Sequence, residues 1–323
     1  MKSIKNFLEL TRGYSLLMTF ASCLVIFGFA NFSPRFTLLN FLLLTLGVSC
    51  VQLGANLFDD LIDVKTKLKK GIELKDITFK TFLPKARLIT NSTYSFSQIE
   101  RILNILFSIA IGVGVCFIIF SGWKILIFML IGGILTLFYP ISSRYYCSEL
   151  IIGSIFGPLV IMGGFYALTQ EFSSNLFILS LAIFFTTLVL LHTHNIMDWE
   201  FDIEENKNTL AILSGNKQNA IKILIAFITI AYLIILIGVL SARLNPNTLY
   251  VFLTLPIAAK LIESINDYVI IKDVEFKPRW YYGFFENWEE IKENKVDFYM
   301  FRLYLARNFA FFFALLTAIG TII

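Results

Sequence analysis

Long apolar runs separated by polar stretches dominate the hydropathy pattern of the chain. Nine such runs can be counted, and they cover residues 14–33, 36–58, 102–121, 124–141, 150–168, 176–195, 220–241, 248–271 and 307–323. A helix needs about 20 apolar residues to cross the hydrocarbon of a bilayer. The pattern therefore predicts an all-α integral membrane protein whose nine transmembrane helices form a single bundle.

Composition strengthens this prediction. Hydrophobic residues make up 57% of the chain and charged residues only 15%, whereas soluble domains carry about 25% charged residues. No linker rich in Pro, Gly or Ser divides the chain, and the four cysteines lack the spacing of a metal site. We therefore expect one membrane domain over residues 1–323, with polar elaborations at 59–101 and 272–306.

The basic residues predict how the bundle is oriented. Most of the 27 lysines and arginines fall in the N-terminus and in the loops after the second, fourth, sixth and eighth runs. Loops rich in Lys and Arg stay in the cytoplasm. The sequence thus predicts a multi-pass protein of the cell (inner) membrane whose long polar segments face the cytoplasm.

The end of the second apolar run carries an acidic motif, "ANLFDDLID". If the helix continues through it, a rotation of about 100° per residue places four polar side chains on one stripe. These are Asn56, Asp59, Asp60 and Asp63.

A matching motif, "HNIMDWEFD", ends the sixth run. Its Asn195, Asp198 and Asp202 repeat the spacing of the first motif and share one stripe, while Glu200 and Glu204 fall on the opposite side. The two motifs suggest two equivalent half-sites contributed by the two halves of the bundle.

Stacked carboxylates repel one another, so a cation must compensate them. Oxygen ligands suit Mg²⁺, which often bridges carboxylates to a substrate phosphate. Lys207 and Thr209, shortly after the second motif, could hold phosphate oxygens. The pattern favours a clamp for a magnesium diphosphate, although acids that merely solvate helix ends are the alternative.

With these motifs the sequence resembles the UbiA superfamily of membrane prenyltransferases. In "DDLIDVKTK", Asp60 and Asp63 match the first superfamily motif, Asp59 stands where Asn is usual, and Lys67 replaces the last Asp. The second motif is matched by Asp198, Asp202, Asn206, Lys207, Thr209, Leu210 and Ala211.

Within that superfamily the sequence is most similar to the 1,4-dihydroxy-2-naphthoate prenyltransferases of menaquinone synthesis. The similarity rests on "NLFDDLID", on "HNIMD" and on "SELIIGSIFGPLVIMGGFY", which contains Glu149 and Tyr166. Three segments depart from the pattern. In "YPISSR" Tyr139 matches but Ser143 replaces a Lys, with Arg144 as a substitute; "TRGYSLL" lacks a proline after Arg12; and 272–306 has no counterpart.

The resemblance implies a reaction and a set of site residues. An isoprenyl chain would pass from a prenyl diphosphate to an aromatic acceptor, with Mg²⁺ as cofactor. The implied metal ligands are Asp59, Asp60, Asp63, Asp198 and Asp202, of which Asp60 and Asp198 are also catalytic, and the implied diphosphate-binding residues are Asn56, Asn195, Arg144, Lys207 and Thr209.

Further residues are candidates for the acceptor side of the reaction. Glu149 could deprotonate or orient a hydroxylated acceptor, and Tyr139 could line the path of the carbocation. Tyr166, His194 and Arg12 are weaker candidates for contact with the acceptor or the carbocation. The bilayer surrounds the protein, and we expect no nucleic-acid partner.

Two other classes of function fit part of the pattern. A transporter would use the acids as a cation site between the two halves, although such sites tend to lie near the membrane midplane. A non-catalytic protein that binds quinone or lipid is also compatible with the altered motifs. The segment 272–306 alternates aromatic and charged residues, which predicts an interfacial helix or lid.

Overall fold

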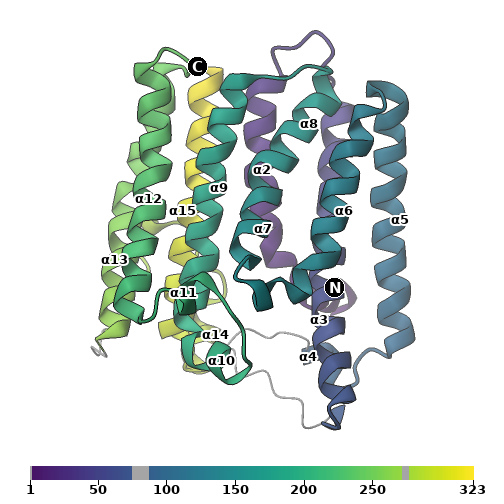
Figure 1. The fold of residues 1–323 in the computed structure, drawn as a ribbon, viewed down its shortest axis with the longest axis vertical. Helices are drawn as coiled ribbons and strands as arrows, with labels where there is room; N and C mark the ends of the chain where they lie inside the picture. The colour runs from purple at the N-terminus through teal and green to yellow at the C-terminus, as the bar shows by residue number, and fades with distance from the viewer. Residues whose placement is uncertain (1, 75–86, 271–275) are drawn as a thin grey trace.

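A computed structural model describes residues 2–74, 87–270 and 276–323. Nine helical spans within these ranges are long and apolar enough to cross a membrane, and no strand occurs in them. The spans stand side by side in one bundle (Figure 1). The prediction of an all-α membrane protein with nine transmembrane helices is confirmed.

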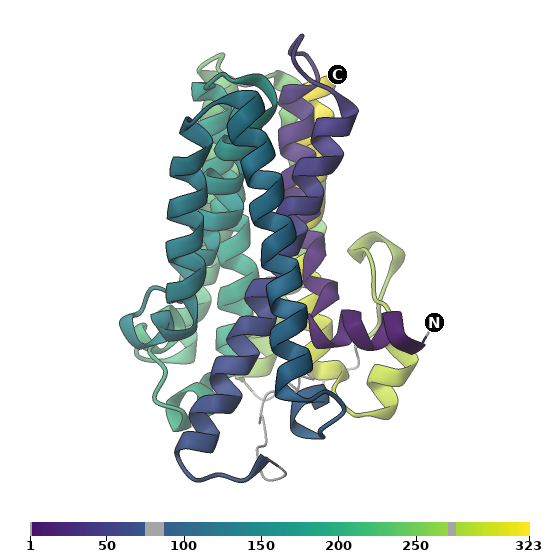
Figure 2. The same cartoon turned by 90° about the vertical axis from the view of Figure 1, so that its right-hand side faces the viewer.

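The first half of the chain supplies four spans. Its elements are α1 (Lys2–Leu10), η1 (Gly13–Ser15), α2 (Leu16–Ala30), α3 (Leu38–Lys69), α4 (Arg87–Thr90), α5 (Phe96–Ser121) and α6 (Lys124–Ser142). The side chain of Thr37 caps the start of α3, and Ser95 with Gln98 forms a capping box at the start of α5. The short helix α1 lies across the bundle axis (Figure 2).

The second half supplies five more spans. Its elements are η3 (Ser143–Tyr145), α7 (Ser148–Ser154), η4 (Ile155–Leu159), α8 (Val160–Thr169), α9 (Ser174–Met197), α10 (Trp199–Glu204), α11 (Leu210–Leu213), α12 (Lys217–Leu240), η5 (Pro246–Thr254), α13 (Leu255–Val269), η6 (Trp280–Tyr282), α14 (Trp288–Glu293) and α15 (Asp297–Ile322). The fifth span bends at Gly157 and Pro158. A Cβ at Gly157 would stand only 2.8 Å from the carbonyl oxygen of Ser180, so a larger residue cannot pack there.

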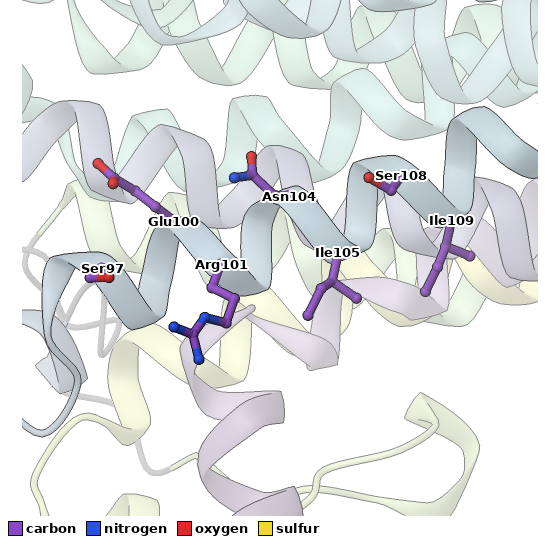
Figure 3. A pocket seen from close by; sticks show the side chains of 7 residues that line it. All are labelled: Ser97, Glu100, Arg101, Asn104, Ile105, Ser108 and Ile109. Atoms are coloured by element: carbon purple, nitrogen blue, oxygen red, sulfur yellow. The ribbon is translucent and has the colours of Figure 1, made fainter.

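Helices α9 and α15 form the centre of the bundle. Most of their spanning residues are buried, and they pack against α2 and α12. Helix α5 is the most exposed span, at the edge of the bundle (Figure 1). Ser97, Glu100, Arg101, Asn104, Ile105, Ser108 and Ile109 line an open depression along it (Figure 3). Every lining residue comes from this one helix, so the depression is a feature of the outer surface.

The last helix begins earlier than hydropathy predicts. The apolar run starts at residue 307, but α15 starts at Asp297. Arg302, Arg307 and Asn308 lower the apparent hydropathy of this stretch, yet all three are buried between helices. Residues 297–306 of the expected elaboration at 272–306 are therefore part of a transmembrane helix.

The described remainder of that elaboration, residues 276–296, folds back onto α15. The side-chain amide of Asn308 donates hydrogen bonds to the carbonyls of Tyr282 and Phe284, each 2.9 Å long. Arg307 donates to the carbonyl of Phe284 and to the carboxylate of Glu286, also at 2.9 Å. These two buried polar residues satisfy backbone groups that would otherwise lack partners away from water.

The turn in this segment requires a glycine. Gly283 has a φ of +96°, and a Cβ there would stand 2.8 Å from the Asn308 amide nitrogen. The segment stands out from the bundle on the same side as the N-terminus (Figure 2). Trp280 in this segment is 90% exposed, and Trp is enriched at membrane–water interfaces.

We expect Asn308→Leu to open this segment locally without unfolding the bundle. The two hydrogen bonds from Asn308 to this segment are lost, each worth about 1 kcal/mol, so tryptic cleavage after Arg279 should become about 30-fold faster. Asn104→Leu is the control, because Asn104 lies on the exposed outer face of α5 (Figure 3). Equal cleavage rates in the two purified variants would contradict this role of Asn308.

Candidate active site

The first acidic motif lies on a continuous helix. Helix α3 runs without a break through the motif to Lys69, so the helical spacing assumed from the sequence holds there. The side chain of Asp60 is 1% exposed and that of Asp59 is 15% exposed. Helix α3 therefore turns these carboxylates away from solvent, at the end of the bundle where α10 and α11 also lie (Figure 1).

Arg12 is the counterion of the first motif. Its Nε donates to Asp60 Oδ2 at 3.2 Å, and its Nη2 lies 3.3 Å from Asp59 Oδ2 and also bonds Asp60 Oδ1. Burial by itself would lower the pKa of the Arg12 guanidinium. The charges of Asp60 and Asp59 outweigh that effect and raise its pKa well above the ordinary value.

Asn56 fastens the segment that carries Arg12. Its side-chain nitrogen donates to the carbonyl of Thr11 at 3.1 Å and to Ser15 Oγ at 2.8 Å. Gln52, one turn earlier, donates to the same Ser15 oxygen at 3.0 Å. Arg12 itself has a left-handed backbone conformation, with a φ of 53°. This turn and these hydrogen bonds hold the guanidinium over the acids of α3.

The second acidic motif lies at a break between two helices. Helix α9 ends at Met197, Asp198 has non-helical dihedral angles, and α10 starts at Trp199. Asp198 and Asp202 are 5% and 3% exposed, whereas the side chain of Glu200 is 67% exposed. The separation of buried Asp from exposed Glu follows the predicted stripe.

Basic side chains lie close to the second motif as well. His194 Nδ1 lies 3.4 Å from Asp198 Oδ2, and Lys207 Nζ lies 3.7 Å from Asp202 Oδ1. The backbone nitrogen of Lys207 also donates to the carbonyl of Asp202 at 2.8 Å. Each motif thus has its own positive or ionisable partners inside the protein.

An ion pair joins the helices that carry the two motifs. Lys67, one turn beyond Asp63 on α3, places its Nζ 3.3 Å from Glu205 Oε1 at the end of α10. Residues 59–67 and 198–205 therefore approach each other from opposite halves of the chain. This contact joins the end of α3 to the end of α10.

Further predicted residues gather at the same end of the bundle. Tyr139, near the end of α6, has as its electrostatic neighbours Asp59, Asp63, Glu149 and Arg12. The loop after α6 contacts the loop after the second motif, because Asn208 donates to the carbonyls of Ser143 and Arg144. The Arg144 side chain is exposed, and Thr209 is buried as the N-cap of α11.

Glu149 ties α7 to the second motif. It is 1% exposed, and its Oε1 accepts hydrogen bonds from Asn195 Nδ2 at 2.6 Å and from the backbone nitrogen of Leu210 at 3.0 Å. His192 Nδ1 lies 3.8 Å from the same oxygen. One carboxylate thus contacts both the end of α9 and the loop that follows α10.

The structure does not bring Tyr166 to this site. Tyr166 lies near the end of α8, where its ring stacks on Phe172 with the centroids 4.8 Å apart. Lys124, at the start of α6, stands over the same ring. These neighbours belong to the end of the bundle opposite α10 (Figure 1).

The donor set suits a hard cation. Within the part of the chain that the structure describes, no three His, Cys, Asp or Glu side chains form a metal-binding cluster. Two carboxylates of α3 nevertheless share one guanidinium, so they already lie close to a positive charge. Oxygen-only ligands of this kind match the preference of Mg²⁺.

A sequence profile of the UbiA prenyltransferase family matches residues 16–285. The chain belongs to this family. Membership makes it a membrane prenyltransferase, which confirms the enzyme class expected from the sequence and sets the transporter hypothesis aside.

Two curated relatives of this UbiA family member are naphthoate prenyltransferases. The chain is 25% identical over 265 residues to the 1,4-dihydroxy-2-naphthoate octaprenyltransferase of Bacillus subtilis, across 81% of each chain. It is 32% identical over 120 residues to the 2-carboxy-1,4-naphthoquinone phytyltransferase of Synechocystis, across 37% of this chain and 39% of the relative.

Solved structures confirm the UbiA-type fold. A structure described as a digeranylgeranylglyceryl phosphate synthase matches with a TM-score of 0.59 at 15% identity, over 100% of this chain and 99% of that one. A UbiA homologue from Archaeoglobus fulgidus bound to GPP and Mg²⁺ matches with a TM-score of 0.55 at 15% identity, over 94% and 98% of the two chains.

Sequence reasoning named Arg12 for contact with the acceptor or carbocation and missed its ion pair with Asp59 and Asp60. The spacing along the chain gives no signal for this pair, because 47 residues separate Arg12 from Asp59. It also missed Lys67 as a partner of Glu205. The signal in the sequence was Lys67 itself, a basic residue at a position of the first motif where an Asp is usual.

We expect Arg12→Met to destabilise the metal-free protein, since two carboxylates lose their counterion. The free energy of unfolding should fall by about 1–3 kcal/mol, seen as a lower Tm in buffer with EDTA. Mg²⁺ should raise the Tm of the variant more than that of the parent protein. Arg35→Met is the matched control, because Arg35 bonds Gln170 at the other end of the bundle; an equal response to Mg²⁺ in both variants would argue against a shared cation site.

Proposed function

We propose that this UbiA family member transfers an isoprenyl chain from a prenyl diphosphate to an aromatic acceptor in a magnesium-dependent reaction. The ion pair between Lys67 and Glu205 supports the proposal, because it joins the end of α3 to the end of α10, next to the two acidic motifs. The structural neighbour bound to GPP and Mg²⁺ supports the same class of donor and metal.

The five aspartates would hold the metal and its diphosphate. Asp59, Asp60 and Asp63 would serve from α3, and Asp198 and Asp202 from the α9–α10 junction. When bound, Mg²⁺ would neutralise the charge of the diphosphate and of the leaving group. Arg12 now neutralises Asp59 and Asp60, and on donor binding its guanidinium becomes free to contact the diphosphate or the acceptor.

The chain's basic residues would stabilise the departing diphosphate. Lys207 has its ammonium group 3.7 Å from Asp202 and 29% of its side chain exposed, so it can reach phosphate oxygens without leaving the motif. Arg144 is exposed on the neighbouring loop. Charge-assisted hydrogen bonds of this kind are about twice as strong as neutral ones.

The transfer step requires a dry aromatic wall. The allylic C–O bond breaks, its electron pair leaves with the diphosphate, and a ring carbon of the acceptor attacks the resulting allylic cation before losing a proton. Tyr139 has Asp59, Asp63 and Glu149 as charged neighbours, and its ring would attract such a cation by roughly 0.5–2 kcal/mol. Asn56 and Asn195 bond protein groups, which suits a role in shaping the diphosphate site.

Glu149 fits a positioning role. Its buried carboxylate orients Asn195 and the backbone of Leu210, and both groups flank the second motif. We assign Glu149 the task of setting the distance between α7 and this motif. His194 Nδ1 lies 3.4 Å from Asp198 Oδ2, and the His194 side chain lies between Asp198 and α15.

The acceptor we propose is a dihydroxynaphthoate. Both curated relatives have names that specify a naphthalene ring with a carboxyl group. Each named substrate carries a carboxylate that a guanidinium such as that of Arg12 can bind in a bidentate manner. We place the site on the cytoplasmic side of the cell membrane, because most Lys and Arg residues lie at this end.

We expect Asp60→Asn and Asp198→Asn each to lower magnesium-dependent diphosphate release from geranyl diphosphate by at least about 100-fold, since each removes a charge that holds the metal. Glu200→Gln is the control, because Glu200 belongs to the same motif but faces solvent, where charges contribute little. The measurement is diphosphate release by purified protein with and without an acceptor. Full activity in both Asp variants would remove them from the site.

We expect 1,4-dihydroxy-2-naphthoate to be a better acceptor than 4-hydroxybenzoate, by at least about ten-fold in kcat/KM. The larger ring system offers more surface and an adjacent hydroxyl and carboxylate. Prenylated product, measured by mass spectrometry with donors of several chain lengths, gives the ratio. Preference for the single-ring acid would contradict the proposed acceptor class.

A further inference from the structure

The second acidic motif is contacted by residues of α13 and α15 that belong to neither acidic motif. Asp198 stands alone between α9 and α10, with a φ of −93° and a ψ of 14°. A helix end leaves backbone carbonyls that need partners from elsewhere in the fold. The backbone conformation at this break thus sets the orientation of the Asp198 carboxylate. A group that holds the backbone at the break therefore also holds the carboxylate in that orientation.

Tyr268, on α13, contacts the backbone directly before this break. Its hydroxyl donates a hydrogen bond of 3.2 Å to the carbonyl of Met197. Its ring lies 5.0 Å from the ammonium group of Lys217, which itself pairs with Glu200 at 2.6 Å. Tyr268 therefore links the α9–α10 junction to both α12 and α13.

Arg302, on α15, holds Tyr268 in place. Its guanidinium carbon lies 5.1 Å from the centroid of the Tyr268 ring and 4.8 Å from that of Phe276. Its Nε donates to the carbonyl of Ser264 at 2.7 Å, and its Nη1 donates to the carbonyl of Phe298. Arg302 is 1% exposed, and an arginine buried so deeply within a membrane bundle is costly and normally serves a function.

The same helix makes a second contact with the motif. Tyr299, three residues before Arg302, packs edge to face against His194 with the ring centroids 6.1 Å apart. His194 in turn lies 3.4 Å from Asp198. Helices α13 and α15 therefore support the second motif through its backbone and through a side chain. Arg302 lies beyond residue 285, where the match to the family profile ends.

We infer that Tyr268, held by Arg302, is a positioning residue that fixes the helix break at Asp198 for binding of the magnesium diphosphate. The inference rests on the proposed function. Loss of the hydroxyl should let the α9–α10 junction fluctuate, so that Asp198 spends less time in the orientation that binds. Groups that orient a metal ligand from behind commonly change metal affinity by 10–100-fold when removed.

The test compares two variants that each lose one hydrogen-bonded tyrosine hydroxyl. Tyr268→Phe removes the hydrogen bond to Met197. Tyr232→Phe, the control, removes a hydrogen bond of 2.7 Å between Tyr232 and Thr254, which joins α12 to η5 and touches neither motif. Binding of geranyl diphosphate to the full-length, detergent-purified protein is titrated by calorimetry at fixed Mg²⁺. We expect the Kd to rise about ten-fold in Tyr268→Phe and to stay within about two-fold of the parent value in Tyr232→Phe.

Hydrogen exchange separates failure of this inference from failure of the proposed function. Peptides covering residues 194–201 should exchange faster in Tyr268→Phe than in the parent protein and in Tyr232→Phe, with no ligand present. Unchanged exchange, or an unchanged Kd in Tyr268→Phe beside normal binding by the parent, overturns the positioning role. Failure of the parent protein to bind geranyl diphosphate with Mg²⁺, together with faster exchange in the variant, overturns the proposed function and leaves the support of the break intact.

Discussion

Repulsion between buried carboxylates at the edge of the membrane is the constraint on which this structure depends. Asp60, Asp198 and Asp202 are each at most 5% exposed, and charges buried to this degree need partners. The protein supplies Arg12 to the first motif, and Lys207 with His194 to the second. These internal partners offset the charge of the acids within the protein, and on the proposed function a magnesium-bound diphosphate would bring further positive charge.

The elements around the two acidic motifs contribute residues that hold these acids or their partners in position. The N-terminal segment carries Arg12 and is fastened by Asn56. Glu149 connects α7 to the end of α9 and to the loop before α11. From the other side, Tyr268 and Tyr299 contact the second motif from α13 and α15. Residues far apart along the chain thus converge on two short acidic stretches.

The polar residues of α15 have a common physical explanation. Arg307 and Asn308 donate to carbonyls of the irregular segment before α15, and Arg302 donates to the carbonyl of Ser264 on α13. Irregular backbone within a membrane protein persists only where such partners exist. The cost of burying Arg307 and Asn308 in this span is therefore offset by the carbonyls of Tyr282 and Phe284 that they satisfy, and these bonds hold the segment 276–296 against the bundle.

The sequence by itself determined the nine spans, the helical stripe of acids on α3 and the resemblance to a prenyltransferase, because hydropathy and spacing are local properties, whereas the helix break at Asp198 in the second motif appeared only in the structure. Only the tertiary structure decided that α15 begins at Asp297, that Arg12 pairs with Asp60, that Lys67 meets Glu205, and that Tyr166 lies at the opposite end from the acids. Each of these depends on contacts between residues far apart in the chain. Arg302 and Asn308 lower the hydropathy averaged over neighbouring residues, so the sequence pattern treats this stretch as a loop. Both residues are nevertheless buried in a helix, because they have hydrogen-bond partners elsewhere in the fold.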